Sequence, residues 1–321
     1  MRIPGLRRVR QSARWLRSRF TGGALILGYH RVADVQEDPY RLCVSTQHFA
    51  EHLEVIRRHT HPMGLSALLD ALDAGQLPDR AVVMTFDDGY ADLLEQVRPL
   101  LDRHDVPATA FIVVGSLGRP FWWDELAGAL LASDAHTTPA SALDSGAPPL
   151  GQSDGDKANV RVRTVLAMYQ TLRQSSGEER ERAIAELAEQ GGSPRVTGRL
   201  PRALTADEVA ELASSGLIEI GSHTLSHATL ASLSTAQQRR EILESKRSLE
   251  ELLQRPVRSF SYPDGSVSGE TAELVRQAGF RCGCTSDQDV VRLRSDPFRL
   301  PRFWARDWSG ADFERWLLRQ H

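Results

Sequence analysis

The chain has 321 residues, of which 41% are hydrophobic and 25% are charged, a composition typical of a soluble globular protein with room for one barrel-sized domain or two smaller ones. Its formal net charge of −3 gives no general attraction to nucleic acid, and no nucleic-acid partner is expected. The three cysteines have no Cys-x-x-Cys spacing, so the sequence predicts neither a disulfide framework nor a cysteine metal site.

Seven arginines are interleaved with apolar residues in the first twenty positions. No uninterrupted apolar segment precedes the first expected strand, so a secretory signal is not predicted, and no run of about 18 apolar residues predicts a membrane-spanning helix. This basic arm, residues 1–23, is either a solvated terminus or a surface helix in peripheral contact with anionic lipid. In either case we expect a cytoplasmic protein or one bound peripherally to the inner membrane surface.

The first expected core strand places His30 at its carboxyl end. From there strands and helices alternate, which predicts a parallel α/β sheet or barrel. In such barrels the carboxyl ends of the strands carry the active site. Up to residue 120, the expected elements are a strand over 23–30, helices over 45–59 and 64–74, a strand over 81–84, a helix over 91–104 and a strand over 108–114.

Two adjacent carboxylates, Asp87 and Asp88, follow the buried strand at 81–84 within Thr85-Phe86-Asp87-Asp88-Gly89. Burying both without a cationic partner would cost several kcal/mol, so a positive group is expected beside them. Taken alone, the pair is equally compatible with an N-cap or turn that opens the next helix.

The pattern changes between residues 121 and 203. A polar stretch rich in glycine and proline, 133–156, separates two helical stretches at about 123–132 and 160–189. This arrangement predicts an inserted helical subdomain with a flexible middle. The insert would divide the barrel into a first part, residues 24–120, and a second part, residues 204–321.

A second strand-end motif lies in the part of the chain after the insert. The strand that begins at Ile218 is followed by His223 and His227, four positions apart. A histidine pair alone is more often solvated or hydrogen-bonded than bound to a metal. With one Asp, however, it supplies three ligands for a zinc-like ion and leaves a position open for water, which is the catalytic arrangement.

Regular alternation continues to the end of this second part. Thr205 and Glu208 form a capping box for a helix that ends at Ser214. The remaining expected elements are a helix over 233–254, a strand over 259–262, a helix over 269–278, and strands over 281–285 and 298–304. The number of strands favours a distorted (β/α)7 barrel of the α/β class.

Three motifs in register resemble the polysaccharide deacetylase (NodB-homology) family. They are the Thr85–Gly89 motif, the stretch from His223 to His227, and the stretch from Arg255 to Gly265, and the resemblance extends over residues 24 to 304. The resemblance implies that Asp88, His223 and His227 bind a divalent metal, expected to be Zn²⁺. It also implies that Asp87 is the general base.

The chain departs from the family pattern at two places. No Leu-x-His motif follows the histidine pair, and His30 resembles the amino-terminal histidine of rearranged members, so His30 is the predicted general acid; a structural histidine at the strand end is the alternative. Ser261 also stands where the family has an arginine. Arg302 is the predicted replacement for this arginine, and Arg258 is the less favoured candidate. The alternative for each of the two is an ion pair at the protein surface.

Substrate contacts are predicted at the third motif and at several aromatic residues. The backbone N–H of Asp264 is expected to face a developing oxyanion, and Tyr262 and Trp304 are the candidate substrate contacts. Four tryptophans are candidates for stacking on sugar rings, and core packing is the alternative for at least half of them. They are Trp122, Trp123, Trp304 and Trp308.

These residues predict a metal-dependent deacetylase that removes acetyl groups from N-acetylhexosamine units of a polysaccharide or oligosaccharide, in cell-surface or exopolysaccharide metabolism. An N-acetylated glycan is the expected partner. Two alternatives remain open: deacetylation of a small or lipid-linked sugar precursor, and non-catalytic glycan binding on a deacetylase-like barrel. The complete Asp and His set argues against the second alternative, because a binding protein has no need for it.

Overall fold

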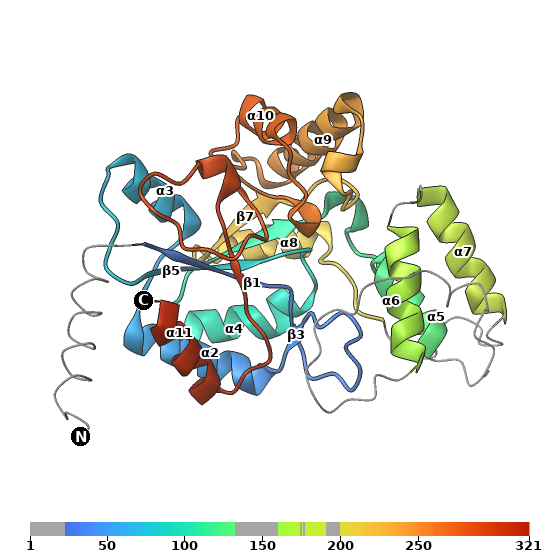
Figure 1. Ribbon diagram of the computed structural model, residues 1–321, viewed down its shortest axis with the longest axis horizontal. Coiled ribbons are helices and arrows are strands. Elements are labelled where there is room, and N and C mark those ends of the chain that lie inside the picture. The colour runs from blue at the N-terminus through green and yellow to red at the C-terminus, as the bar shows by residue number, and fades with distance from the viewer. Residues whose placement is uncertain (1–22, 132–159, 174, 176, 191–199, 321) are drawn as a thin grey trace, which may run out of the picture.

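A parallel sheet that curls into a barrel forms the centre of the molecule (Figure 1). The computed structural model describes residues 23–131, 160–173, 175, 177–190 and 200–320. The strands follow the order β10-β1-β5-β6-β7-β8-β9, and each neighbouring pair is parallel. Their bounds are β1 Leu25–Tyr29, β5 Ala81–Phe86, β6 Ala108–Ile112, β7 Ile218–Ser222, β8 Ser259–Ser261, β9 Cys282–Cys284 and β10 Phe303–Trp304.

One segment links the two edges of this sheet. Leu300 pairs with Cys284 of β9, and three residues later Phe303 pairs with Leu27 of β1. The seven strands therefore close into a ring, and the predicted distorted (β/α)7 barrel is confirmed. A further short strand, β4 (His61–Pro62), pairs with β5 outside this ring.

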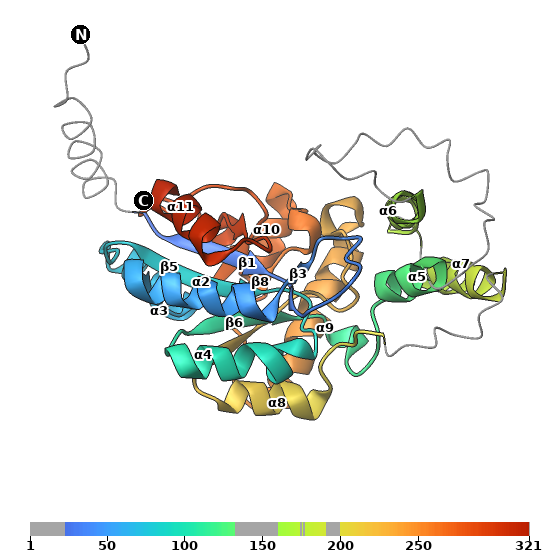
Figure 2. The same cartoon turned by 90° about the horizontal axis from the view of Figure 1, so that it is seen from below.

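Complete burial of the central strands explains their sequences. Every residue of β1, β5 and β6 is buried, as expected for parallel strands that are covered on both faces. Helices surround the ring (Figure 2). They are α2 Thr46–His59, α3 Leu65–Asp73, α4 Arg98–His104, which continues a π-helical turn at Leu93–Val97, α8 Ala206–Ser214, α9 Thr235–Leu253, α10 Gly269–Gln277 and α11 Gly310–Gln320.

Side-chain caps fix where several helices begin. Thr205 and Glu208 form the predicted capping box of α8, Ser234 and Gln237 form one at α9, and Ser45 caps α2. Each cap satisfies backbone N–H groups that the first helical turn leaves unpaired.

The expected last strand, 298–304, is too long. Its first residues form a 3-10 turn, Pro297–Arg299, and only Phe303–Trp304 forms the strand β10. Pro297 and Pro301 explain the difference, because proline has a fixed φ and no N–H to give to a neighbouring strand. Helix α11 and the short strand pair β2 (Arg31–Val32) and β3 (Cys43–Val44) were not predicted.

Three helices, α5 (Trp122–Leu131), α6 (Val160–Leu172) and α7 (Gly177–Gln190), form a group at one side of the barrel (right in Figure 1). They pack around a small apolar cluster of their own that contains Leu126, Leu172 and Ile184. The expected flexible middle of the insert at 133–156 and the basic arm up to residue 22 lie outside the described residues. The proposed domain boundaries stay a prediction.

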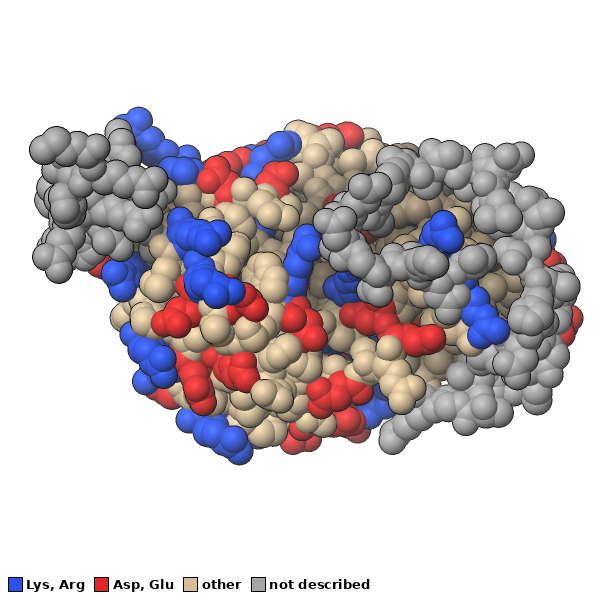
Figure 3. Space-filling model, turned by 60° about the horizontal axis from the view of Figure 1, so that its bottom comes forward, with Lys and Arg blue, Asp and Glu red and all other residues tan. Residues whose placement is uncertain are grey.

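The surface carries charges of both signs. On the face shown in Figure 3, the Lys and Arg side chains of the described residues are interspersed with Asp and Glu. In the part of the chain that the structure describes, no helix combines the length and the apolar character needed to cross a membrane.

Candidate active site

The carboxyl ends of three strands, β1, β5 and β7, and the residue before β10 bring the predicted site residues to one end of the barrel. His30 follows β1, Asp87 and Asp88 follow β5, and His223 and His227 follow β7. Arg302 directly precedes β10, which pairs with β1. Parallel strands end at the same edge, so residues far apart in the sequence meet there.

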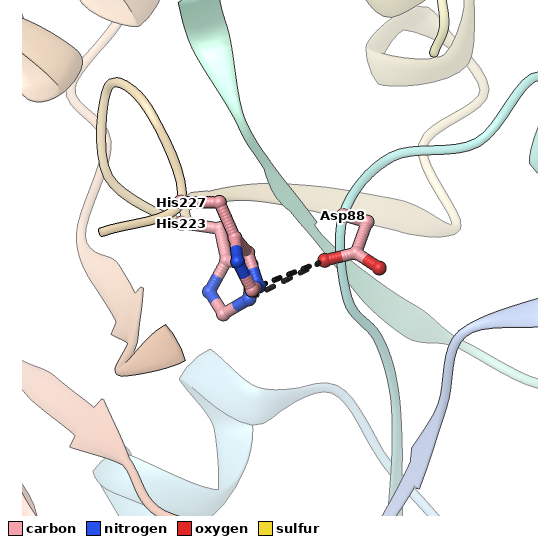
Figure 4. Close-up of side chains that lie close together, drawn as sticks. All are labelled: Asp88, His223 and His227. Carbon is pink, nitrogen blue, oxygen red and sulfur yellow. Dashed lines mark ion pairs between the residues drawn. The ribbon is translucent and has the colours of Figure 1, made fainter. Parts of the chain in front are cut away.

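Three side chains converge as a candidate metal centre (Figure 4). Oδ1 of Asp88 lies 3.4 Å from Nε2 of His227 and 3.6 Å from Nε2 of His223. Ligand atoms at about 2.0–2.2 Å from a tetrahedral Zn²⁺ lie roughly 3.3–3.6 Å apart. The two separations from Asp88 fall in this range, and the three ligand atoms all lie within 4.8 Å of one another.

Two further observations show that these residues fit a cation. Within the described part of the chain, Oδ1 of Asp88 is buried and has no hydrogen-bond partner, which is costly unless a ligand satisfies it. Nδ1 of His223 lies 2.8 Å from the carbonyl oxygen of Ser261. A hydrogen bond there places the proton on Nδ1 and leaves Nε2 free to bind a metal, as in many zinc sites.

The electrostatics of the three residues agree with this interpretation. Burial, with the charge of Asp87, raises the pKa of Asp88 well above its ordinary value. Burial lowers the pKa of His223 to about 3 and lowers the pKa of His227 as well. The imidazoles are therefore neutral at pH 7, which is the form that binds metal.

Asp87 has a different environment from its neighbour. Arg302 is fully buried and donates to both carboxylate oxygens, with Nη1 2.7 Å from Oδ1 and Nη2 2.8 Å from Oδ2. Ser261 donates to Oδ2 at 3.1 Å and accepts from Arg302 at 2.9 Å. Burial alone would raise the pKa of Asp87, but the Arg302 guanidinium, with His223, outweighs burial and holds that pKa well below its ordinary value.

Strained backbone places two of these side chains. Asp88 has φ 70° and His227 has φ 56°, in the left-handed region that non-glycine residues rarely adopt. Such conformations cluster at functional sites, where the surrounding structure enforces them. Gly89 follows with φ 86°, and a Cβ there would lie 2.7 Å from Cδ1 of Ile112, so this position needs glycine.

His30 lies beside the Asp87 and Arg302 pair. Its ring stacks on Trp304 with a centroid distance of 4.6 Å and an interplanar angle of 19°, and Arg302 lies over the same indole at 4.8 Å. Burial lowers the pKa of His30 to about 4, opposed by Asp87 and assisted by Arg302 and His227. The imidazole is therefore neutral at pH 7 and lies within electrostatic reach of the predicted base.

The third motif contributes to the site differently from what the sequence suggested. Tyr262 is buried in the core and donates to the carbonyl oxygen of Phe298 at 2.9 Å, so its side chain does not join the site. The carboxylate of Asp264, whose backbone has φ 57°, accepts from Arg173 of the helical insert and from Thr229, both at 2.9 Å. Arg258, the weaker candidate beside Asp87, is exposed.

Sequence reasoning missed several contacts that the insert makes with the site. The ring of Trp123 lies 4.8 Å from that of His227, and its indole N–H donates to Tyr90, which in turn donates to the buried Asp124. Trp122 stacks on Tyr169 rather than standing free. Two adjacent tryptophans followed by an aspartate at 122–124 do stand out in the sequence. Their neighbours in the chain, however, do not indicate that one of them contacts a histidine about 100 positions away.

The curled parallel ring and its strand-end Asp-His-His group together define a barrel with a candidate metal centre. The sequence profile of the polysaccharide deacetylase family matches residues 74–139 and 165–283, more than half of the chain, and the chain belongs to that family. The family resemblance is thus confirmed, whereas the likeness of His30 to the histidine of rearranged members stays a prediction.

Known relatives match a shorter stretch. The chain is 32% identical over 99 residues to the putative polysaccharide deacetylase YxkH of Bacillus subtilis, a match that covers 31% of this chain and 35% of the relative. It is 32% identical over 88 residues to the poly-beta-1,6-N-acetyl-D-glucosamine N-deacetylase of Escherichia coli K12, covering 27% of this chain and 13% of that protein. The matched stretch thus spans about a third or less of these relatives.

Solved structures show the same fold over nearly the whole length. The Streptococcus pyogenes deacetylase PplD, in complex with acetate, aligns with a TM-score of 0.61 and 17% identity, over 93% of this chain and 97% of that one. IcaB from Ammonifex degensii aligns with a TM-score of 0.61 and 18% identity, over 92% and 97%. At these identities the likeness concerns the fold.

Proposed function

We propose that this protein is a metal-dependent N-deacetylase that removes acetyl groups from N-acetylhexosamine units of a glycan, in cell-surface or exopolysaccharide metabolism. The observation that carries the proposal is the pairing of two sites at one end of the barrel. Asp88, His223 and His227 form a candidate cation site, and Asp87 beside them is held ionised by Arg302. Relatives named as poly-beta-1,6-N-acetyl-D-glucosamine N-deacetylases support the choice of substrate class.

Asp88, His223 and His227 would hold the ion. When bound there, a divalent ion such as Zn²⁺ supplies Lewis acidity, which polarises the acetamide carbonyl and acidifies water. Hydrolysis of an amide needs two more functions that fall to the chain itself. One group must accept a proton from the attacking water, and one must protonate the leaving nitrogen.

Asp87 is the proposed general base. It is ionised at neutral pH because Arg302 compensates its buried charge. Its two oxygens already accept from Arg302 and Ser261, yet a carboxylate has about four lone-pair directions, so one can still accept a proton from water. Arg302 is therefore proposed as the residue that orients the base, in place of the arginine that the family has at the position of Ser261.

His30 is the proposed proton donor to the leaving nitrogen. Because its pKa lies near 4, it is neutral at rest and must first gain the proton before it can give it up. Proximity to Asp87 suits that role, since a nearby carboxylate stabilises the imidazolium. Stacking on Trp304 fixes the plane of the ring, and the exposed part of Trp304 remains a proposed contact for the sugar. The backbone N–H of Asp264 is the proposed donor to the developing oxyanion.

Acetate release tests the proposal. Purified protein is incubated with N-acetylglucosamine oligomers, with added zinc and then with a chelator, alongside the Asp87→Asn variant. We expect zinc-dependent release of acetate, with a loss of about 10²- to 10⁴-fold in the variant. Binding of the oligomers without acetate release would instead indicate a non-catalytic glycan-binding protein. Release from monomeric or lipid-linked sugars but not from oligomers would indicate the precursor-specific alternative.

A further inference from the structure

The loop that carries the second histidine is held in an unfavourable conformation. We call residues 224–227 the histidine loop. Thr224 has φ 67° and His227 has φ 56°, and each non-glycine residue in this region costs on the order of 1 kcal/mol. Without restraint such a loop would relax, and the imidazole of His227 would leave its place beside Asp88.

One carboxylate outside the family motifs restrains this loop. Oε2 of Glu241, in helix α9, accepts from the backbone N–H groups of Leu225 at 3.0 Å and of Ser226 at 2.9 Å. Its Oε1 accepts from the hydroxyl of Ser226 at 2.7 Å. Three donors on two neighbouring residues thus bind one ionised acceptor, and hydrogen bonds to a charged group are about twice as strong as neutral ones.

The barrel holds the opposite side of the loop. Gly115 donates to the carbonyl oxygen of Leu225 at 2.7 Å, and Val114 donates to that of Thr224 at 3.4 Å. Helix α9 is itself fixed to the end of β7 by a buried hydrogen bond between the hydroxyls of Ser245 and Ser222 at 2.8 Å. The histidine loop is therefore clamped between the turn after β6 and the carboxylate of Glu241.

We propose that Glu241 is a positioning residue that sets the affinity of the metal centre by holding His227 in ligating geometry. The inference rests on the proposed metal site. Glu241 is not one of the three candidate ligands, and it would act through the loop residues Leu225 and Ser226. Residues of this kind around metal sites typically change metal affinity by about 10- to 100-fold when removed.

The test measures zinc affinity directly, by competition between the metal-free protein and a chromophoric chelator. Glu241→Ala removes the acceptor, Glu241→Gln keeps its shape without its charge, and Ser226→Ala removes one of the three donors. Glu244→Ala is the matched control, because Glu244 is exposed on the same helix and pairs with Arg240 instead. Thermal denaturation of each metal-free variant reports on folding separately.

We expect the Kd for zinc to rise about 10- to 100-fold in Glu241→Ala and less in Glu241→Gln and Ser226→Ala, with no change in Glu244→Ala. Added zinc should restore activity to Glu241→Ala. A lower Tm with an unchanged Kd would show a purely structural role and overturn the inference. If Glu241→Ala does not fold, an unchanged Kd in both milder variants overturns it. Zinc binding by a wild-type protein that releases no acetate would refute the proposed function alone.

Discussion

Asp87 and Asp88 are neighbours in the sequence, yet their surroundings drive their proton affinities in opposite directions. Burial alone would raise the pKa of both carboxyls, but Asp87 has a guanidinium bound to both of its oxygens, which lowers its pKa below the ordinary value. Asp88 instead has one buried oxygen without a hydrogen-bond partner among the described residues. Paired carboxyls whose pKa values are forced apart mark acid-base sites, and here they distinguish the proposed base, Asp87, from the proposed metal ligand, Asp88.

Replacing Arg302 should change both the pH profile and the stability. In Arg302→Gln the pKa of Asp87 rises, so the base is protonated at a higher pH and the acidic limb of the pH–rate profile moves upward. Loss of one partner of a buried ion pair should also lower the free energy of unfolding by about 3–5 kcal/mol.

Initial rates across the pH range and urea denaturation measure these two effects. Arg302→Lys keeps the charge but not the two-pronged geometry, so its effects should be smaller. Arg299→Gln is the control, because Arg299 is exposed in the same segment. An acidic limb that stays in place in Arg302→Gln would refute the role assigned to Arg302.

Replacing His30 should slow the chemical step while leaving metal binding intact. For His30→Ala we expect kcat to fall by about 10²- to 10⁴-fold, the range of general acid-base catalysis, with zinc affinity unchanged. His61→Ala is the control, since His61 is exposed in β4. If His30→Ala lowers only Tm and leaves kcat at the wild-type value, His30 is a structural residue of the strand end.

Among the helices and strands, the sequence predicted those whose position depends on interactions between residues close together in the chain. Apolar runs located β1, β5 and β6, and the Thr205 capping box gave the start of α8 to the residue. The strand expected over 298–304 is shorter in the structure, because Pro297 and Pro301 interrupt strand pairing before Phe303. Helix α11 was missed although its apolar side packs on α2, with Phe313 stacked on His52 at 4.1 Å. Contacts of that kind follow from the arrangement of the barrel rather than from the helix sequence.

Close packing between β1 and β10 makes Gly28 critical for the site. A Cβ at Gly28 would lie 2.7 Å from two ring atoms of Trp304, so Gly28→Ala must displace the indole on which His30 stacks. We expect a loss of about 1–3 kcal/mol in the free energy of unfolding, together with a lower kcat. Urea denaturation measures the free energy of unfolding, and steady-state kinetics measure kcat.

Gly269→Ala gives the matched comparison, because a Cβ at that position, in the first turn of α10, meets no atom within 4 Å. It should leave kcat unchanged and stability equal or slightly higher, since alanine is the better helix former. If Gly28→Ala and Gly269→Ala had the same kcat and the same free energy of unfolding, the close contact between Gly28 and Trp304 would be dispensable.

Across the whole molecule, only some residues of the candidate site could be predicted from the sequence. The Asp and His motifs could be predicted because each motif spans only a few consecutive residues. Arg302 was inferred only from a missing motif residue, and the contact itself joins positions 215 apart. Glu241 belongs to an ordinary helix and Arg173 directly follows one, so neither carried such a signal. Trp123 stands out beside Trp122 and Asp124 in the sequence, but its contact with His227 depends on the arrangement of the barrel.

Buried acid groups should make stability depend on pH across the molecule. Burial raises the pKa of Asp124 to about 7, against the hydrogen bond from Tyr90. A carboxyl with a raised pKa in the folded state stabilises the fold fully below its unfolded value of about 3.9 and loses that contribution as the pH rises through 7.

The Asp124→Asn variant isolates this contribution. From about pH 5 to about pH 7, the wild type should lose stability relative to Asp124→Asn, with a slope of at most about 1.4 kcal/mol per pH unit. Urea denaturation at the two pH values measures it, with the exposed Asp79→Asn as control. A stability difference that does not change with pH would contradict the buried, proton-binding state of Asp124.

The segment from Leu300 to Trp304 closes the ring and also delivers Arg302 to Asp87. If this segment were undocked, the two edges of the sheet would lose their link and the Asp87 carboxylate would lose its buried counter-charge at the same time. One short piece of chain thus completes both the backbone pairing of the barrel and the charge balance of the proposed base. A substitution that loosens this piece should therefore weaken stability and the proposed activity together.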